Sequence, residues 1–534
     1  MKELEEKFKN MHLLPRGERI QLIKQIERFR PEPLKKFFPP YIYWSRCQVN
    51  VLIVCDGSLN FGTLGPHLSE FLTTFEQLES TGSVFVDYRV TLAHRGVITN
   101  STSPVVVNHI SNFKFDTSVT LSKFDQVWLF GFDSGASISP GEIAAITAYM
   151  NGGGGLFATG DHGALGGAMG RGIPRVKDMR YWDNFPSSVD ANSEVAMNGR
   201  RRNDTNRPGA GQTVSNQFNN QADNIPQVIA VRAFGAGQPH PLLSISPSIR
   251  ASGIIDIMPD HPHEGECTPE TSFTVNGVTV PTQIIAHSAV LAGSTASGTN
   301  KAPTEAHTFP SISVWDGHKA NVGRIVIDST WHHFVNVNLL GLSDPDFEVI
   351  RQYYMNIARW MTRRKLMLCF RRRVIFDLLF NSQLIEANLN DPTVDIKKIS
   401  LNDLASIGGL AEEILTERLG ASNAKQFLLD TLEDFNPKLA ESLEEWSPLK
   451  TQKKSEKEYY QSWFNPDLIL WSAIGSGFIA LRDHFSDDVA KLDEKVLNDV
   501  AEVFSKGLDY GYSASLNAFE ASFKDFTKVC KYKK

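Results

Sequence analysis

The stretch that decides the fold is Gly155-Leu156-Phe157-Ala158-Thr159-Gly160, which runs directly into Asp161-His162-Gly163. A short, nearly continuous apolar run is typical of a strand that is buried on both faces of a parallel sheet. The glycines at 160 and 163 predict a sharp turn from strand into helix, which exposes the residues between them. The same residues are compatible with a tight turn in which Asp161 caps the next helix. Both interpretations stay open from sequence.

Similar apolar runs occur on either side of this stretch, at 49–55, 84–92, 126–131, 253–258, 283–290, 311–315 and 323–327. Helical patterns separate several of them. One helix is expected near 68–78, and another at 143–150, where Ser139 and Glu142 have the spacing of a capping box. Alternating strands and helices of this length predict an α/β fold with a doubly wound, mostly parallel sheet.

A chain of 534 residues has room for two to four domains. We expect an N-terminal helical arm at 1–47, an α/β domain at 48–384 and a helical domain at 385–534. The α/β domain carries a predicted insertion at about 164–250, which is rich in Gly, Asn, Arg and Pro. Small residues in the segment 468–481 predict a close helix contact, either within the chain or between copies in a homo-oligomer.

The net charge of -6 gives no support for a nucleic-acid partner. No stretch reaches the roughly 18 consecutive apolar residues that would predict a membrane span. Five cysteines, Cys47, Cys55, Cys267, Cys369 and Cys530, are scattered without a CxxC pair. A reduced, cytoplasmic protein is the simplest interpretation of this pattern.

Three clusters of Asp, His and Glu follow predicted strands. They are Asp161-His162, Asp260-His261-Pro262-His263-Glu264, and Asp328 with His332-His333. Because the carboxyl ends of parallel strands meet at one edge of a sheet, we expect the three clusters to lie together. Asp56 and Asp133 follow two further strands, and each is either a substrate-binding residue of this site or a loop cap.

Neutral imidazole and carboxylate are the ligands of zinc and related divalent ions. The predicted metal ligands are His162, Asp260, His261, His263, His332 and His333, although one of the last two is expected to be structural. Asp161 or Glu264 is the predicted catalytic general base. Arg175 and Arg180 either bind an anionic part of the substrate or fix the insertion through salt bridges.

Two segments resemble the class I glutamine amidotransferase-like superfamily, in its trehalose-utilisation (ThuA-like) branch. The first is 152–162, a glycine-rich strand leading to a His-containing turn, and the second is 323–332, a strand ending near a histidine. The resemblance implies a flavodoxin-like sheet with its site at the turn. True amidotransferases carry a nucleophilic cysteine there, whereas this chain has Asp161, so cysteine-based glutamine hydrolysis is not expected.

These patterns lead to one main hypothesis, a metal-dependent hydrolase acting on an amide, ester or glycosidic bond of a small polar substrate, with zinc as the expected divalent metal. The alternative is a non-catalytic sensor or scaffold whose helical region contacts a partner. Metal-free acid–base catalysis by Asp161 and His162 is a third option.

Overall fold

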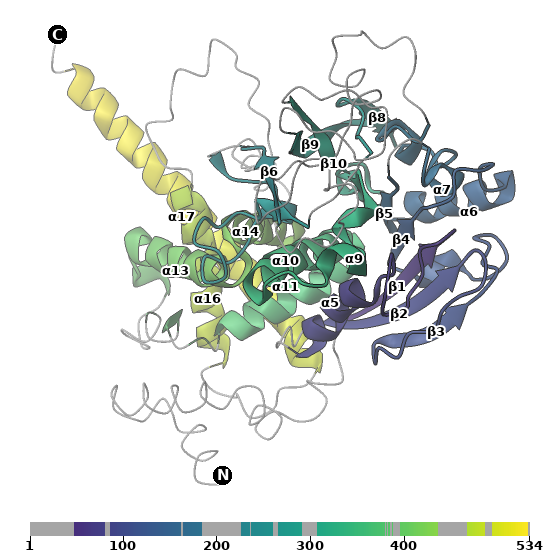
Figure 1. The fold of residues 1–534 in the computed structure, drawn as a ribbon. Helices are drawn as coiled ribbons and strands as arrows, with labels where there is room; N and C mark the ends of the chain where they lie inside the picture. Colours follow the sequence, from purple (N-terminus) through teal and green to yellow (C-terminus); the bar gives the residue numbers. More distant parts are fainter. Residues whose placement is uncertain are drawn as a thin grey trace. The chain divides into compact units, whose positions relative to one another are not determined.

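The computed structural model describes residues 47–80, 86–161, 164–183, 226–234, 237–259, 265–290, 307–379, 381, 383, 384, 387, 396–435, 467–485 and 494–531. Contacts divide these residues into two units (Figure 1). The α/β unit comprises the described parts of Gln48–Ala233 and Pro239–Met367, and the helical unit comprises Cys47, Phe234–Gln238 and the chain from Leu368 onward. The boundary expected at 384 therefore lies at 367, because the apolar residues of 375–384 pack into the core of the helical unit.

An 11-stranded sheet forms the centre of the α/β unit in the described residues. Its order is β3-β2-β1-β4-β5-β11-β10-β9-β6-β7, with β8 paired to β9. The strands are β1 Cys47–Cys55, β2 Val86–His94, β3 Val106–Ile110, β4 Gln126–Phe130, β5 Gly155–Thr159, β6 Gln227–Val231, β7 Ile257–Met258, β8 Ser272–Val275, β9 Val278–Val290, β10 His307–Trp315 and β11 Ile325–Asp328.

Four neighbouring strands, β1, β4, β5 and β11, run parallel to one another. Their register places Val54, Leu129, Ala158 and Ile327 in one row across the sheet. Every residue of β4 and β5 is buried, as expected for a sheet covered on both faces. The carboxyl ends of the four strands therefore share one edge, which we call the carboxyl edge.

The other half of the sheet is antiparallel, which corrects the expectation of a mostly parallel order beyond β11. Strands β11, β10, β9, β6 and β7 pair antiparallel in turn. Strand β6 lies within the segment expected to be an irregular insertion, so part of that insertion belongs to the sheet. The hairpin of β8 and β9 turns at Asn276-Gly277, both with positive φ, and Asn-Gly is the strongest short-range hairpin signal.

Helices cover both faces of the parallel half. They are α5 Ser69–Ser80, α6 Pro140–Asn151, α7 Gly167–Gly170, α9 Asn336–Leu339 and α10 Asp344–Trp360. Helix α6 packs on the face that carries Leu129 and Ala158. On the opposite face, the ring of Phe71 from α5 contacts Trp128 and Tyr354 of β4 and α10, at centroid distances of 5.3 and 5.2 Å.

The capping box predicted at the start of α6 is confirmed. Ser139 Oγ accepts a hydrogen bond from Glu142 N at 3.2 Å, and Glu142 Oε2 accepts one from Ser139 N at 3.1 Å. These two bonds satisfy backbone donors that a helix otherwise leaves without partners at its first turn.

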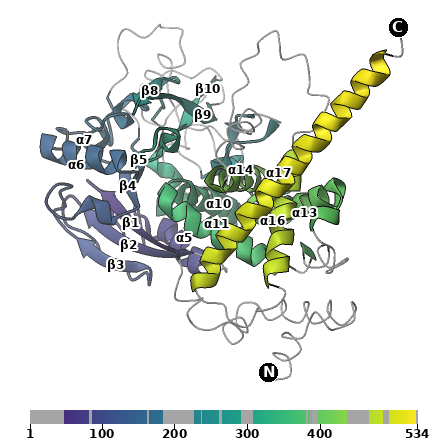
Figure 2. The ribbon, with the colours of Figure 1, turned by 180° about the vertical axis from the view of Figure 1, so that it is seen from behind.

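The helical unit contains α11 Arg364–Leu379 from Leu368 onward, and also α13 Leu401–Leu419, α14 Ala421–Phe435, α16 Asp467–Phe485 and α17 Glu494–Lys531 (Figure 2). Its helices approach closely at glycines. A Cβ at Gly475 of α16 would lie 1.9 Å from Leu404 O of α13, and one at Gly477 would lie 2.5 Å from the Phe504 ring of α17. The small residues predicted to serve either an oligomer or an internal contact therefore serve an internal one.

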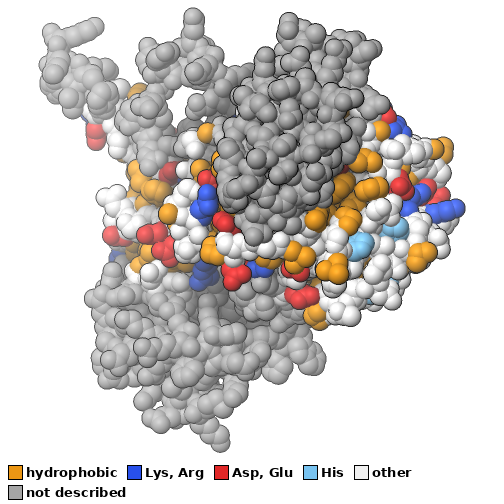
Figure 3. Space-filling view, viewed as in Figure 1, with side chains coloured by type: hydrophobic (Ala, Val, Ile, Leu, Met, Phe, Trp, Pro, Cys, Tyr) orange, Lys and Arg blue, Asp and Glu red, His pale blue; other side chains and the backbone are white. Residues whose placement is uncertain are grey.

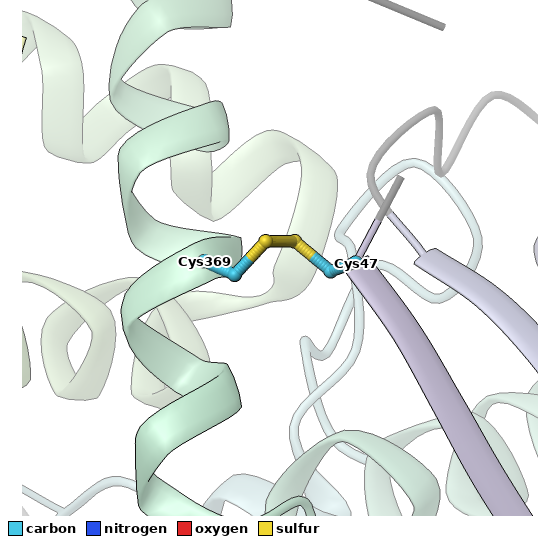
Figure 4. Close-up of a disulfide and its surroundings, with 2 residues drawn as sticks. All are labelled: Cys47 and Cys369. Atoms are coloured by element: carbon cyan, nitrogen blue, oxygen red, sulfur yellow. A yellow bond between two sulfur atoms is a disulfide. The ribbon is translucent and has the colours of Figure 1, made fainter. Parts of the chain in front are cut away.

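Cys47 and Cys369 form a disulfide within the helical unit (Figure 4). Their Cα atoms lie 6.0 Å apart, although 322 residues separate them in sequence. The expectation that all cysteines are reduced is therefore wrong for this pair. Disulfide pairing depends on distances in the folded chain, which sequence spacing does not reveal. Cys55 is a buried free thiol, as expected, and burial raises its pKa well above the usual value.

Among the described residues, no helix combines the length and apolar content that a bilayer crossing requires. On the face drawn in Figure 3, acidic and basic side chains of the described residues are interspersed rather than separated.

Candidate functional site

Two loops meet at the carboxyl edge. The first follows β5 and carries Asp161, and the second follows β11 and includes the short turn η8, Trp331–His333. Trp331 N donates a 2.8 Å hydrogen bond to Gly160 O, which joins the loops. Residue 160 must be glycine here, because a Cβ would lie 2.3 Å from Leu165 O. The sequence prediction that Asp161 and His332 share one edge is confirmed by this geometry.

The Asp161 carboxylate is completely buried between these loops. Thr330 Oγ1 donates to Asp161 Oδ1 at 2.9 Å, and Asp161 Oδ2 lies 3.5 Å from His332 Nε2. Thr330 Oγ1 also accepts a hydrogen bond from His332 N at 3.1 Å. One threonine therefore fixes both the carboxylate and the backbone of the histidine.

The tautomer of His332 follows from its other ring nitrogen. His332 Nδ1 lies 2.8 Å from Asn338 Oδ1, and because an amide oxygen only accepts, Nδ1 carries the proton. Nε2 then faces Asp161 either as a lone pair or, in imidazolium, as a second donor. Two acceptors do not attract each other, so the contact is favourable when a proton or another cation lies between them.

His333 is oriented in the same way by a carboxylate. Its Nδ1 lies 2.9 Å from Asp328 Oδ2, which also accepts a hydrogen bond from Tyr353 OH at 2.9 Å. Thr330, Asn338 and Tyr353 were not predicted as site residues. Their roles come from η8, α9 and α10 folding back on the edge, and no spacing pattern indicates this.

Arg180 fixes the main chain of both loops instead of facing an open anion site. The side chain is buried, and it donates to Asp161 O, to Ser329 O at 2.9 Å and to Tyr181 O at 2.9 Å. The contacts of Arg180 with the described residues do not support the role of holding an anionic substrate group. The alternative, that Arg180 holds down the insertion, agrees with them.

Arg175 is not brought to this site. It donates to Asn151 Oδ1 at 2.9 Å and lies 5.3 Å from the Trp315 ring. Trp315 pairs with Ile325, the first residue of β11, so Arg175 lies at the opposite edge of the sheet. Arg175 was expected near Asp161 because it follows the turn at 160–163 in sequence.

Asp56 follows β1 at the carboxyl edge and caps the loop after β4. Its Oδ1 accepts hydrogen bonds from Phe132 N at 2.5 Å and Asp133 N at 3.0 Å. No described residue donates to its buried Oδ2. Burial raises the pKa of the Asp56 carboxyl from 3.8 to about 6, against the lowering effect of the two backbone donors. Asp133 lies on the exposed side of this loop.

An aromatic row connects this loop to the histidine. The Phe132 ring lies 5.9 Å from the Trp331 ring, which stacks on His332 at 4.1 Å. The rings of Phe132 and Trp331 therefore lie between the loop that Asp56 caps and the Asp161–His332 pair.

Five predicted site residues, His162, Asp260, His261, His263 and Glu264, lie outside the described residues. The strand before the second cluster, β7, is a two-residue antiparallel strand at the far end of the sheet order, which corrects the expectation of a buried parallel strand there. Gly265, the first described residue after this cluster, lies beside the loop that follows β11. A Cβ at Gly265 would lie 2.5 Å from Ser329 O.

A pocket of about 320 Å³ opens on the antiparallel half. Its lining includes Arg232, Glu266, Cys267, Glu270 and His287. The segment 266–267 also borders the candidate site, because Glu266 O accepts from Tyr181 N at 3.1 Å and Cys267 pairs with Arg180 in an isolated β-bridge. The segment 266–267 therefore lies between the pocket and the candidate site.

The fold and site together define a mixed α/β protein with a buried Asp–His pair at the carboxyl edge. Among the described residues, no group of three or more His, Cys, Asp or Glu side chains could hold a metal ion.

No family model and no curated protein matches the sequence. One solved structure, titled "mmIFT52 N-terminal domain", is similar at 9% identity and a TM-score of 0.27, over 57% of this chain and 97% of that chain. A likeness at that score carries no argument about function.

Proposed function

We propose that the carboxyl edge binds a divalent cation through Asp161 and His332, and that the protein is a metal-dependent hydrolase. One observation carries the proposal, the 3.5 Å separation of Asp161 Oδ2 and His332 Nε2. A direct charge-assisted hydrogen bond between these groups would be about 2.7–2.9 Å long. Two ligand atoms on one tetrahedral zinc ion, with bonds of about 2.0–2.2 Å, lie roughly 3.4 Å apart.

The environment of both histidines supports this assignment. Metal-binding histidines almost always donate their second ring N–H to a carboxylate or carbonyl oxygen, which fixes the tautomer. His332 has Asn338 Oδ1 in that role, and His333 has Asp328. A site needs more than two ligands, and we assign the others to His162, Asp260, His261 and His263. The position of Gly265 beside Ser329 supports the contribution of the second cluster.

The proposed chemistry is hydrolysis of an amide, ester or glycosidic bond in a small polar substrate. A bound divalent cation would polarise the scissile group and lower the pKa of a water molecule. With Asp161 held by Thr330 as a ligand, Glu264 becomes the proposed general base. The pocket of about 320 Å³ that shares a wall with the site is within the size range of small-molecule pockets, so we assign it to the part of the substrate that does not react.

We further propose that the sheet is flavodoxin-like and that the chain is related to the ThuA-like branch. Five neighbouring strands of the sheet lie in the order β2-β1-β4-β5-β11. If these five are numbered 1 to 5 by their order along the chain, the spatial order is 2-1-3-4-5, which is the flavodoxin-like order. In that arrangement ligands bind outside the carboxyl ends of the strands, where the candidate site lies.

The second candidate is a non-catalytic cation or ligand sensor. It is favoured by the complete burial of Asp161, His332 and His333, because a substrate has no direct access to buried groups. Under this proposal the cation would stabilise the joined loops without turnover.

A titration of chelator-treated, full-length protein with Zn²⁺ tests the proposal. We expect one tight site per chain, weakened at least tenfold in His332→Gln and Asp161→Asn. His240→Gln is the matched control, because His240 is also a buried histidine but lies beside Trp360, away from the carboxyl edge. Turnover of ester, amide or glycoside substrates by the zinc-loaded protein supports the hydrolase. Tight binding without turnover supports the sensor, and no binding overturns both.

A further inference from the structure

Tyr88 of β2 lies at the amino-terminal end of the parallel strands. The carboxyl ends of the neighbouring strands β1 and β2 are level, because Arg95 N, directly after β2, donates a 2.9 Å hydrogen bond to Cys55 O. Tyr88 is near the beginning of β2 and is therefore level with the beginning of β1. We call this side of the sheet, opposite the candidate site, the amino edge. The Tyr88 ring contacts the ring of Phe75 in α5 at a centroid distance of 5.5 Å.

Arg359 lies at the same edge, in the last turn of α10. The side chain of Gln126, the first residue of β4, donates a hydrogen bond to Ala358 O. The Gln126 amide oxygen accepts a hydrogen bond from Trp128 Nε1 at 3.2 Å, and the Trp128 ring lies 5.9 Å from the Phe75 ring. These contacts place the end of α10 beside the same aromatic rings of α5 and β4.

Neither side chain has an acceptor in the part of the chain that the structure describes. Tyr88 is 2% exposed, and its hydroxyl makes no hydrogen bond to these residues. Arg359 is partly exposed, and its guanidinium makes neither a hydrogen bond nor an ion pair with them. Arg363, one turn further along, shows the usual arrangement, because it donates to Phe124 O at 2.8 Å and lies 3.4 Å from Asp125 Oδ1.

The two groups also act on each other electrostatically. Burial raises the pKa of Tyr88, and the positive charge of Arg359 opposes that rise. Burial lowers the pKa of Arg359, and among the described residues no carboxylate opposes that effect. At neutral pH both groups are therefore donors, one a neutral phenol and the other a partly desolvated guanidinium.

Donors without an acceptor predict a ligand that accepts. Leaving a desolvated cation unpaired is unfavourable, and an anion beside it removes that penalty. The guanidinium fork donates to two oxygens of an oxyanion, and the phenol can donate to a third. We propose that Arg359 and Tyr88 bind a phosphate group of a small molecule at the amino edge. This site is separate from the proposed cation site, which lies at the carboxyl edge.

The place of Arg359 in the last turn of α10 offers a simpler explanation, which the contacts do not favour. A basic residue there often donates to the last carbonyls of its own helix and interacts favourably with the helix dipole. Ala358 O instead accepts from Gln126, and Arg359 donates to no helix carbonyl among the described residues. The explanation also leaves the buried hydroxyl of Tyr88 without an acceptor, whereas a bound phosphate satisfies both side chains.

Isothermal titration calorimetry of the full-length protein with inorganic phosphate, in a buffer without other oxyanions, tests the proposal. Arg359→Gln should weaken phosphate binding at least about tenfold, and Tyr88→Phe, which keeps the ring contact with Phe75, by about three- to tenfold. The matched control is Arg89→Gln. Arg89 follows Tyr88 in β2 but is exposed on the other face of the sheet, so the control removes the same charge and should leave phosphate binding unchanged.

Three results would overturn the proposal. The first is a wild-type protein that binds no phosphate up to about 10 mM. The second is equal weakening in Arg359→Gln and Arg89→Gln, which would indicate a general charge effect. The third is tighter binding of acetate than of phosphate at equal ionic strength, which would assign the site to a carboxylate. Circular dichroism checks that each variant is folded, and if Arg359→Gln is not, the comparison of Tyr88→Phe with Arg89→Gln decides.

Discussion

Burial of Asp56 raises the pKa of its carboxyl group from 3.8 to about 6, because the side chain leaves water while only one of its oxygens receives hydrogen bonds. The folded state therefore binds a proton more tightly than the unfolded state. Asp56 stabilises the fold fully below about pH 4, and this contribution is lost as the pH rises through about 6. A difference of about two pKa units corresponds to roughly 3 kcal/mol.

Asp56→Asn should remove this pH dependence. We expect the free energy of unfolding of the variant, relative to wild type, to rise by about 2–3 kcal/mol between pH 4 and pH 7. Urea unfolding at a series of pH values measures it. In the control Asp133→Asn the loss should shift to lower pH, since the Asp133 charge raises the pKa of Asp56. A constant difference between Asp56→Asn and wild type across the range would contradict the account.

The positions of single site residues could be predicted from sequence only where the residues follow closely after a strand. Asp161 follows an apolar run and a glycine, and His332 follows another run in the parallel half, so both could be placed on one edge. Thr330 and Asn338 hold the pair in place, but neither has an unusual sequence context. Arg180 was identified with two alternative roles, and sequence could not choose between them, because only its contacts with backbone carbonyls distinguish a structural tie from an anion site.

At the level of elements, two adjacent glycines of α13 give a matched test of helix packing. A Cβ at Gly408 would lie 2.0 Å from Trp471 O of α16, whereas one at Gly409 would have no neighbour closer than 3.7 Å. Gly408→Ala should therefore destabilise the helical unit by about 1–3 kcal/mol through overpacking. Gly409→Ala should stabilise it by about 0.5–1 kcal/mol, because alanine favours the helix. Thermal unfolding compares the two, and equal effects would mean that α13 and α16 do not meet at Gly408.

The sequence predicted most strands but not their direction. Short apolar runs look alike in parallel and antiparallel sheets when both faces are buried. The Asn276-Gly277 pair, which indicates the hairpin of β8 and β9, was the one local signal of the change to antiparallel pairing. As a result of that change, strand β7, which precedes the Asp260–Glu264 cluster in sequence, lies at the far end of the sheet order.

At the scale of the whole molecule, the disulfide between Cys47 and Cys369 closes a long loop. Peptide mapping without reductant should recover the two cysteines as one linked peptide. Cys369→Ser should lower the free energy of unfolding by about 2–4 kcal/mol. Reductant should destabilise the wild type by a similar amount and leave the variant unchanged. Quantitative alkylation of both thiols in the folded, untreated protein would contradict the assignment.

The proposed cation site would also combine distant parts of the sequence, because its proposed ligands come from the loops after β5 and β11 and from the Asp260–Glu264 cluster. Anomalous diffraction at the zinc absorption edge, from crystals grown with Zn²⁺, locates such an ion directly. The account predicts a peak within about 2.0–2.2 Å of both Asp161 Oδ2 and His332 Nε2. A map without a peak there, with the two side chains in direct hydrogen-bond contact, would contradict it.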